Sequence, residues 1–97
     1  MIADVLDGAA DLLEERGWCQ NDYETPEGQM CLAAALTESA LRYHQSWSVA
    51  LAAAVEARGV VMKATRTRSV PAYNDADGRT LPEILTLVRG LAKDQRA

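Results

Sequence analysis

The sequence has no phenylalanine and a single histidine, His44, among its 97 residues. A zinc site needs about four ligands, and only Cys19 and Cys31 could join His44 as nitrogen or sulfur donors. The spacing of these three residues matches no zinc module. We therefore expect neither a metal site nor another cofactor.

Long hydrophobic runs are also missing. No stretch approaches the ~20 apolar residues of a membrane span. The N-terminal region is acidic and has neither the basic start nor the apolar middle of a signal peptide. We expect a cytoplasmic protein without membrane contact, located in the host cytoplasm if the gene belongs to a phage.

Cysteine is scarce as well, and a cytoplasmic chain keeps Cys19 and Cys31 reduced. Cys31 lies near the start of a predicted helix, where the pKa of a thiol is lowered, and His44 could act as its base. This makes a cysteine-dependent enzyme one alternative. However, the two residues lie about 20 Å apart along what looks like one helix, which favours Cys31 as a small buried residue.

Charge is unevenly distributed within the net value of −4. Residues 1–27 hold eight acids and one base, whereas residues 28–97 hold nine bases and six acids. Residues 58–68 contain four bases and no acid, which would suit an anion, a solvated loop or a complement to the acidic first helix. Without interleaved aromatic residues this run is a weak phosphate footprint, so nucleic acid is not the expected partner.

Apolar periodicity predicts four helices. The first ends at Gly17, the second spans roughly 29–44, and the third spans roughly 47–58 and stops at Gly59. The fourth follows Thr80, which is a good N-cap in front of a Pro and a Glu that complete a capping box. On the third helix, one side is expected to face the core, and it carries Trp47, Ala50, Leu51, Ala54 and Val55.

The segments between these helices differ in character. Residues 18–28 form a polar connection. Residues 59–79 are predicted as a mobile loop up to Ser69, with a hairpin or edge strand as the alternative, followed by an ordered turn from Val70. The sequence thus predicts one all-α domain over 1–97, with four helices, a long loop and an ordered polar turn before the last helix. The last helix is expected to pack against the first.

Large aromatic residues are expected to supply much of a core that is otherwise rich in alanine. The four residues concerned are Trp18, Tyr43, Trp47 and Tyr73. For the two tryptophans, a role as core anchors is favoured over a role as interaction hot spots.

The polar turn at residues 73–80 is the one place where polar groups gather. A calcium loop is excluded because Ile84 would occupy the position of the required acid. Asn74 or Asp75 is expected to bond nearby backbone N–H groups, and Asp77 with Gly78 to form the tight turn. The alternative is a ligand or partner surface, because a helix N-terminus can also bind an anion. The candidate binding residues are Trp18, Tyr73, Asn74, Asp75 and Arg79.

Three segments carry a resemblance to a known family. Residues 12–20, 28–36 and 73–80 are similar, in this order, to an uncharacterised family of small proteins from actinobacteria and their phages. Its pattern has Gly-Trp before an optional Cys, Gly-x-x-Cys leading into a helix of small residues, and Trp-Asn-Asp before Gly-Arg-Thr. This chain differs in having Tyr73 in place of tryptophan and a longer, more basic stretch before Val70. The resemblance implies no activity.

We therefore expect a non-enzymatic protein-interaction module, such as a phage-encoded modulator of a host protein. The alternatives are a small-molecule or anion-binding domain that uses the turn from Tyr73 to Thr80, and a cysteine-dependent enzyme that uses Cys31. The expected partner is a host or cellular protein. A homodimer stays open, because a small alanine-rich core stabilises only marginally and self-association would add buried area.

Overall fold

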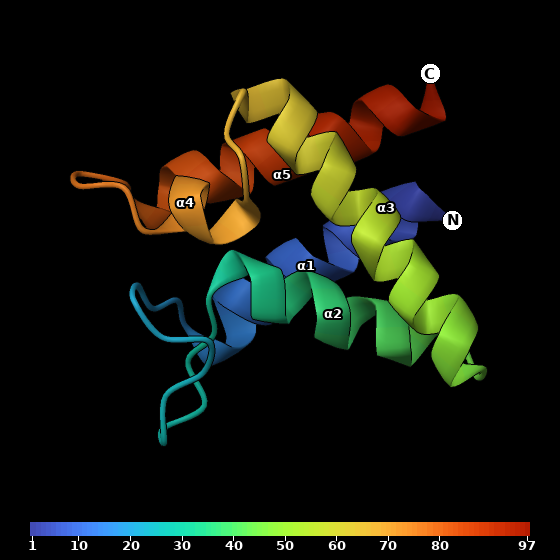
Figure 1. Ribbon diagram of the computed structural model, residues 1–97, viewed down its shortest axis with the longest axis horizontal. Helices are drawn as coiled ribbons and strands as arrows, with labels where there is room; N and C mark the ends of the chain where they lie inside the picture. Colours follow the sequence, from blue (N-terminus) through green and yellow to red (C-terminus); the bar gives the residue numbers. More distant parts are fainter.

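The computed structural model describes residues 1–97 and is entirely helical (Figure 1). Its helices are α1 (Ile2–Arg16), α2 (Leu32–Tyr43), α3 (Trp47–Thr65), α4 (Val70–Asn74) and α5 (Leu81–Arg96). The all-α prediction is confirmed, whereas the predicted count of four helices is wrong because α4 is a further short helix. None of the helices has the length and apolar character needed to cross a membrane.

Helix α1 lies at the centre of the structure, with α2 on one side and α5 on another. The predicted packing of the last helix against the first is confirmed. Helix α2 approaches α1 closely at Gly8, where a methyl group would collide with the hydroxyl of Ser39. That hydroxyl donates a hydrogen bond to the carbonyl oxygen of Val5 at 2.8 Å. Glycine is favoured here because the side chains of Ser39 and Tyr43 on α2 occupy the space that a side chain at position 8 would take.

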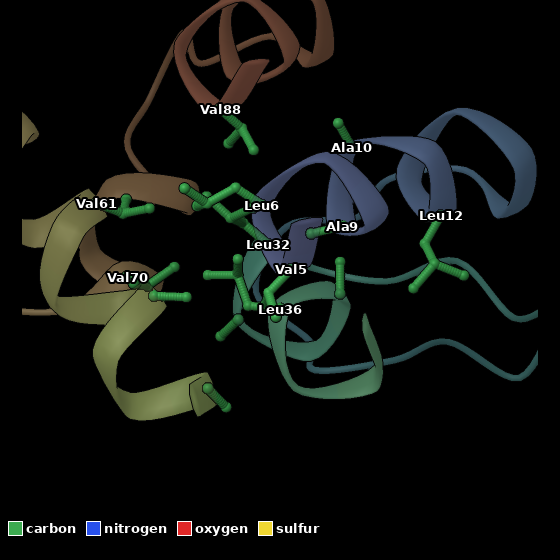
Figure 2. Close-up of a cluster of buried hydrophobic side chains, with 14 of the residues drawn as sticks. Val5, Leu6, Ala9, Ala10, Leu12, Leu32, Leu36, Val61, Val70 and Val88 are labelled. Carbon is green, nitrogen blue, oxygen red and sulfur yellow. The ribbon is translucent and has the colours of Figure 1, made fainter. Parts of the chain in front are cut away.

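Helix α3 runs through Gly59 to Thr65, so the predicted stop at Gly59 is wrong. The helix continues because Val61, two residues later, is fully buried beside Val70 in the central cluster (Figure 2). It ends at Arg66, which adopts the left-handed conformation with φ 56°. The predicted mobile loop and the alternative hairpin are therefore both wrong. Burial of Val61 outweighs the cost of a helical glycine, about 1 kcal/mol.

The segment from Val70 is a helical turn rather than an irregular one. Ser69 caps it by accepting a hydrogen bond from the backbone N–H of Ala72 at 3.0 Å. Pro71 lies in its first turn, where a missing N–H costs nothing. The prediction that the chain is ordered from Val70 onward is confirmed, and the ordered segment is helix α4.

The core is built mainly from aliphatic side chains. Tyr73 is buried and Trp18 half-buried, but Trp47 is 65% exposed and Tyr43 is 53% exposed. The prediction that all four aromatic residues fill the core is therefore wrong for these two. The largest apolar side chains that are fully buried are Leu6, Leu13, Met30, Leu32, Leu36 and Ile84. Alanines let the helices approach closely, which leaves little space between α2 and α3 for a large ring.

The acidic face of α1 is complemented by α5, not by the basic run at 58–68. Arg89 and Arg96 of α5 form ion pairs with carboxylates along α1. The acceptors are Asp4, Asp7, Asp11 and Glu14. Hydrogen bonds to Asp11 and Glu14 raise the pKa of Arg89 above its ordinary value.

Candidate functional site

The predicted polar turn centres on Asn74, the last residue of α4, whose side chain is completely buried. Its Oδ1 accepts hydrogen bonds from Nε1 of Trp18 at 2.7 Å and from the backbone N–H of Leu32 at 2.9 Å. Its Nδ2 donates to the carbonyl oxygen of Cys19 at 3.1 Å and to Oδ1 of Asp75 at 2.8 Å. The amide thus uses its full hydrogen-bonding capacity within the protein.

Neighbouring polar groups extend this network to the 18–28 connection. Oδ1 of Asp75 accepts a hydrogen bond from the backbone N–H of Asn21 at 2.9 Å. Nε2 of Gln20 donates to the carbonyl oxygens of Asn74 and Ala76, both at 3.1 Å. The connection after α1 is thereby attached to the end of α4.

Arg79 completes the turn in front of α5. Its guanidinium carbon lies 4.0 Å from the centre of the Tyr73 ring, and its Nε donates to the carbonyl oxygen of Tyr73 at 2.9 Å. Its Nη1 forms an ion pair with Glu83 at 3.0 Å. Burial raises the pKa of the Tyr73 hydroxyl, although the nearby Arg79 opposes this shift. Thr80 and Glu83 form the predicted capping box.

The structure therefore brings the five candidate binding residues together at one end of the molecule. Asn74 and Asp75 do accept hydrogen bonds from backbone N–H groups, as expected, but the donors are Leu32 and Asn21, which lie outside the turn. Gly78 has φ 80° in the tight turn, as its predicted role requires. Two surface clefts, of about 780 and 280 Å³, are lined by other residues. What this cluster demonstrably does is join α4, α5 and the start of α2 to the connection after α1.

The two cysteines are both free thiols with structural contacts. Cys31 is buried and caps α2, its Sγ accepting a hydrogen bond from the backbone N–H of Ala34 at 3.4 Å. His44 lies at the opposite end of the same helix, as the sequence predicts. Burial and the neighbouring Cys31 raise the pKa of the Cys19 thiol, which disfavours its reactive thiolate. No three His, Cys, Asp or Glu side chains are grouped as metal ligands.

A second feature, on α3, was not anticipated. Trp47, Leu51 and Val55 are 65%, 39% and 67% exposed. Residues four apart form one ridge along a helix, and this ridge continues through Gly59 and Lys63, which are also exposed. We call these five residues the α3 ridge. Its first three members form a row of apolar side chains that the fold leaves open to solvent.

Sequence reasoning placed Trp47, Leu51 and Val55 on the same side as the buried alanines, and that assignment is wrong. The residues that α3 buries are Ala50, Ala53, Ala54, Ala57 and Val61. These five form an arc of their own at helical spacing, and the ridge lies beside it. The separate arc of small residues is the signal that could have shown that the larger side chains lie outside the core.

A surface cleft with a volume of about 780 Å³ lies on the neighbouring flank of α3. It separates the first turns of α3 from the start of α1 and the end of α5. Its walls include Ile2, Val49 and Ala53, with Glu56 and Arg96 among its charged residues. The first half of α3 therefore presents apolar groups on both of its exposed flanks.

The basic run is exposed at the other end of α3. Arg58 donates a hydrogen bond to Oγ1 of Thr37 on α2 at 2.7 Å. By contrast, Lys63, Arg66 and Arg68 are exposed, and none of the ion pairs involves them. Positive charge therefore follows directly after the apolar part of the ridge.

Comparison with known proteins identifies a family but not its function. A family of unknown function (DUF6197) matches residues 1–94. No curated protein and no solved structure matches the chain. The chain belongs to this family, in line with the resemblance to an uncharacterised family that its motifs suggested.

Proposed function

We propose that this chain, as a member of a family of unknown function, is a non-enzymatic protein-interaction module that binds through the α3 ridge. The observation that carries this proposal is the row of exposed apolar side chains at Trp47, Leu51 and Val55. A helix that is apolar on its buried face and also on an exposed ridge is typical of a helix that has a further packing partner.

The chemistry of the ridge suits a protein partner. Tryptophan is among the residues that contribute most to binding when a partner covers them. Trp47 lies at the first turn of α3 with most of its ring open to solvent. Leu51 and Val55 extend the same row over two further turns, which matches the way amphipathic helices present anchors to a partner.

In this proposal the partner is a protein of the same cell, and the complex forms in the cytoplasm. A host protein that the chain modulates is one such partner if the gene is carried by a phage, and a second copy of the chain is another. The resemblance to proteins of actinobacteria and their phages supports this form of the proposal.

Two other functions have less support. Binding of a small molecule or anion at the turn from Tyr73 to Thr80 would compete with contacts that already use Asn74 and Arg79. Catalysis through Cys31 would require a thiol that instead caps α2 and lies far from His44.

The test is affinity capture from a lysate of the organism that encodes the chain, with three baits compared by quantitative mass spectrometry. The baits are the wild type, Val55→Asp, and Tyr23→Ala as a matched control. Tyr23 is 54% exposed and lies outside α3. We expect a protein retained by the wild type and the control but reduced at least about tenfold with Val55→Asp. Equal retention by all three baits would refute the proposed role of the ridge.

A further inference from the structure

We infer that the partner of the α3 ridge is a second copy of this chain, with the two ridges packed antiparallel about a two-fold axis at Val55. This inference rests on the proposed function of the ridge and names its partner. The argument comes from the order of side chains along the ridge, from its charge and from the area that it offers.

The ridge is complementary to itself when reversed. A two-fold axis at Val55 places Leu51 opposite Gly59 of the second copy, and Trp47 opposite Lys63 of the second copy. The surroundings of Gly59 are open, since no atom lies within 4 Å of the place that a Cβ would take. A large side chain therefore meets a gap, on both sides of the axis.

Gly59 is otherwise unexplained. It is exposed inside a regular helix, where glycine is unfavourable, and neither its φ nor a neighbouring atom requires it. The inferred dimer gives it a role, because the missing side chain leaves room for Leu51 of the second copy.

Charge selects the antiparallel arrangement. In a parallel pair, Lys63 of one copy would face Lys63 of the other. Arg66 and Arg68 would likewise lie near Arg66 and Arg68 of the other copy, so like charges would repel. In the antiparallel pair, these bases lie at opposite ends of a ridge about 24 Å long. Each Lys63 then meets a Trp47 ring, and a cation over an indole is favourable.

The exposed area is smaller than a stable interface needs and is in the range of a weak dimer. From their exposed fractions, Trp47 offers about 130 Å² and Leu51 with Val55 about 110 Å² together. Two copies thus bury about 500 Å² of these side chains, about half of the roughly 1,000 Å² of a specific interface. The flanking Ser48 and Ala52 would contribute part of the remainder. We therefore expect a dissociation constant on the order of 100 µM.

Sedimentation equilibrium of the purified full chain tests this inference over about 5 to about 500 µM, a range that spans the expected dissociation constant. The average mass should rise from 10.5 kDa towards twice that value. Val55→Asp and Gly59→Gln should each raise the dissociation constant at least about tenfold. Tyr23→Ala should change it less than about twofold, because Tyr23 lies outside α3. Circular dichroism checks that each variant is folded.

Cysteine cross-linking tests the orientation, in a Cys19→Ser background that removes the more exposed native thiol. Under mild oxidation, Val55→Cys should form a covalent dimer readily, because the axis brings both copies of this position together. Lys63→Cys should not. Efficient cross-linking at both positions would instead indicate a parallel pair and would overturn the inferred arrangement.

A chain that remains monomeric at about 500 µM overturns the inference, as does a dimer that Val55→Asp leaves intact. The proposed function fails separately. If the chain is monomeric but Val55→Asp abolishes capture of another protein, the ridge is a binding surface and only its partner was misidentified. If the chain is monomeric and capture does not depend on Val55, both proposals are wrong.

Discussion

Replacing Gly59 with alanine should stabilise the folded monomer. Gly59 is exposed within α3, and a Cβ at this position would meet no atom within 4 Å. The substitution therefore adds no clash, and it removes the penalty that glycine carries in a helix interior. Alanine is favoured over glycine there by about 1 kcal/mol.

The expected gain in the free energy of unfolding is about 0.5–1 kcal/mol, or several degrees in Tm for a domain of this size. Urea denaturation followed by circular dichroism at a few micromolar would measure it, since the monomer dominates at low concentration. Gly90→Ala is a matched control, because Gly90 is also exposed and its Cβ would meet nothing, in α5. It should give a similar gain.

Gly8→Ala provides the opposite case. Its Cβ would collide with the hydroxyl of Ser39, and overpacking of this kind costs about 1–3 kcal/mol. We expect it to gain less stability than Gly59→Ala or to lose stability outright. If Gly59→Ala were destabilising while Gly90→Ala stabilised, α3 would not be a continuous helix through residue 59, and the reasoning would be refuted.

Three further predictions concern the polar contacts. Asn74→Leu should lower the free energy of unfolding by roughly 2–4 kcal/mol, because the indole N–H of Trp18 and the backbone N–H of Leu32 lose their acceptor. A loss below about 0.5 kcal/mol in urea denaturation would contradict the role of Asn74. Arg89→Ala should cost less than about 1 kcal/mol, and less in high salt, because its ion pairs with α1 are largely exposed. Burial raises the pKa of Cys19 above its ordinary 9.0 and that of Tyr73 above 10.0, so both groups stabilise the fold while protonated. Their contribution to stability should be fully present below these ordinary values and should be lost as pH rises through the folded-state pKa values. The Cys19→Ser variant should show less of this loss near pH 9. A urea midpoint that rises above pH 9 would contradict both pKa shifts.

Local signals in the sequence were sufficient where a few neighbouring residues decide the structure. The capping box of Thr80 and Glu83 forms as predicted, because both partners lie within one helical turn. Gly17 ends α1 with a positive φ of 95°, a conformation that glycine adopts easily. The run of polar residues from Asn74 to Thr80 was also visible in the sequence.

Contacts between distant residues decided the rest. Gly59 looks like a helix stop, but burial of Val61 against other elements carries the helix past it. The bond from Trp18 to Asn74 joins residues 56 positions apart with α2 and α3 between them, so no local pattern could show it. Periodicity likewise placed Trp47 on an apolar side of α3 without showing that the residues that α3 buries are four alanines and Val61.

Site-specific photo-crosslinking tests the role of the α3 ridge most directly. A photoreactive amino acid is placed at Val55, and separately at Tyr23, and the chain is irradiated in the cells that encode it. The account predicts a discrete covalent adduct from position 55, either with a second copy or with another protein, and none of comparable yield from position 23. No adduct from position 55, or the same adducts from both positions, would contradict the claim that this ridge is a binding surface.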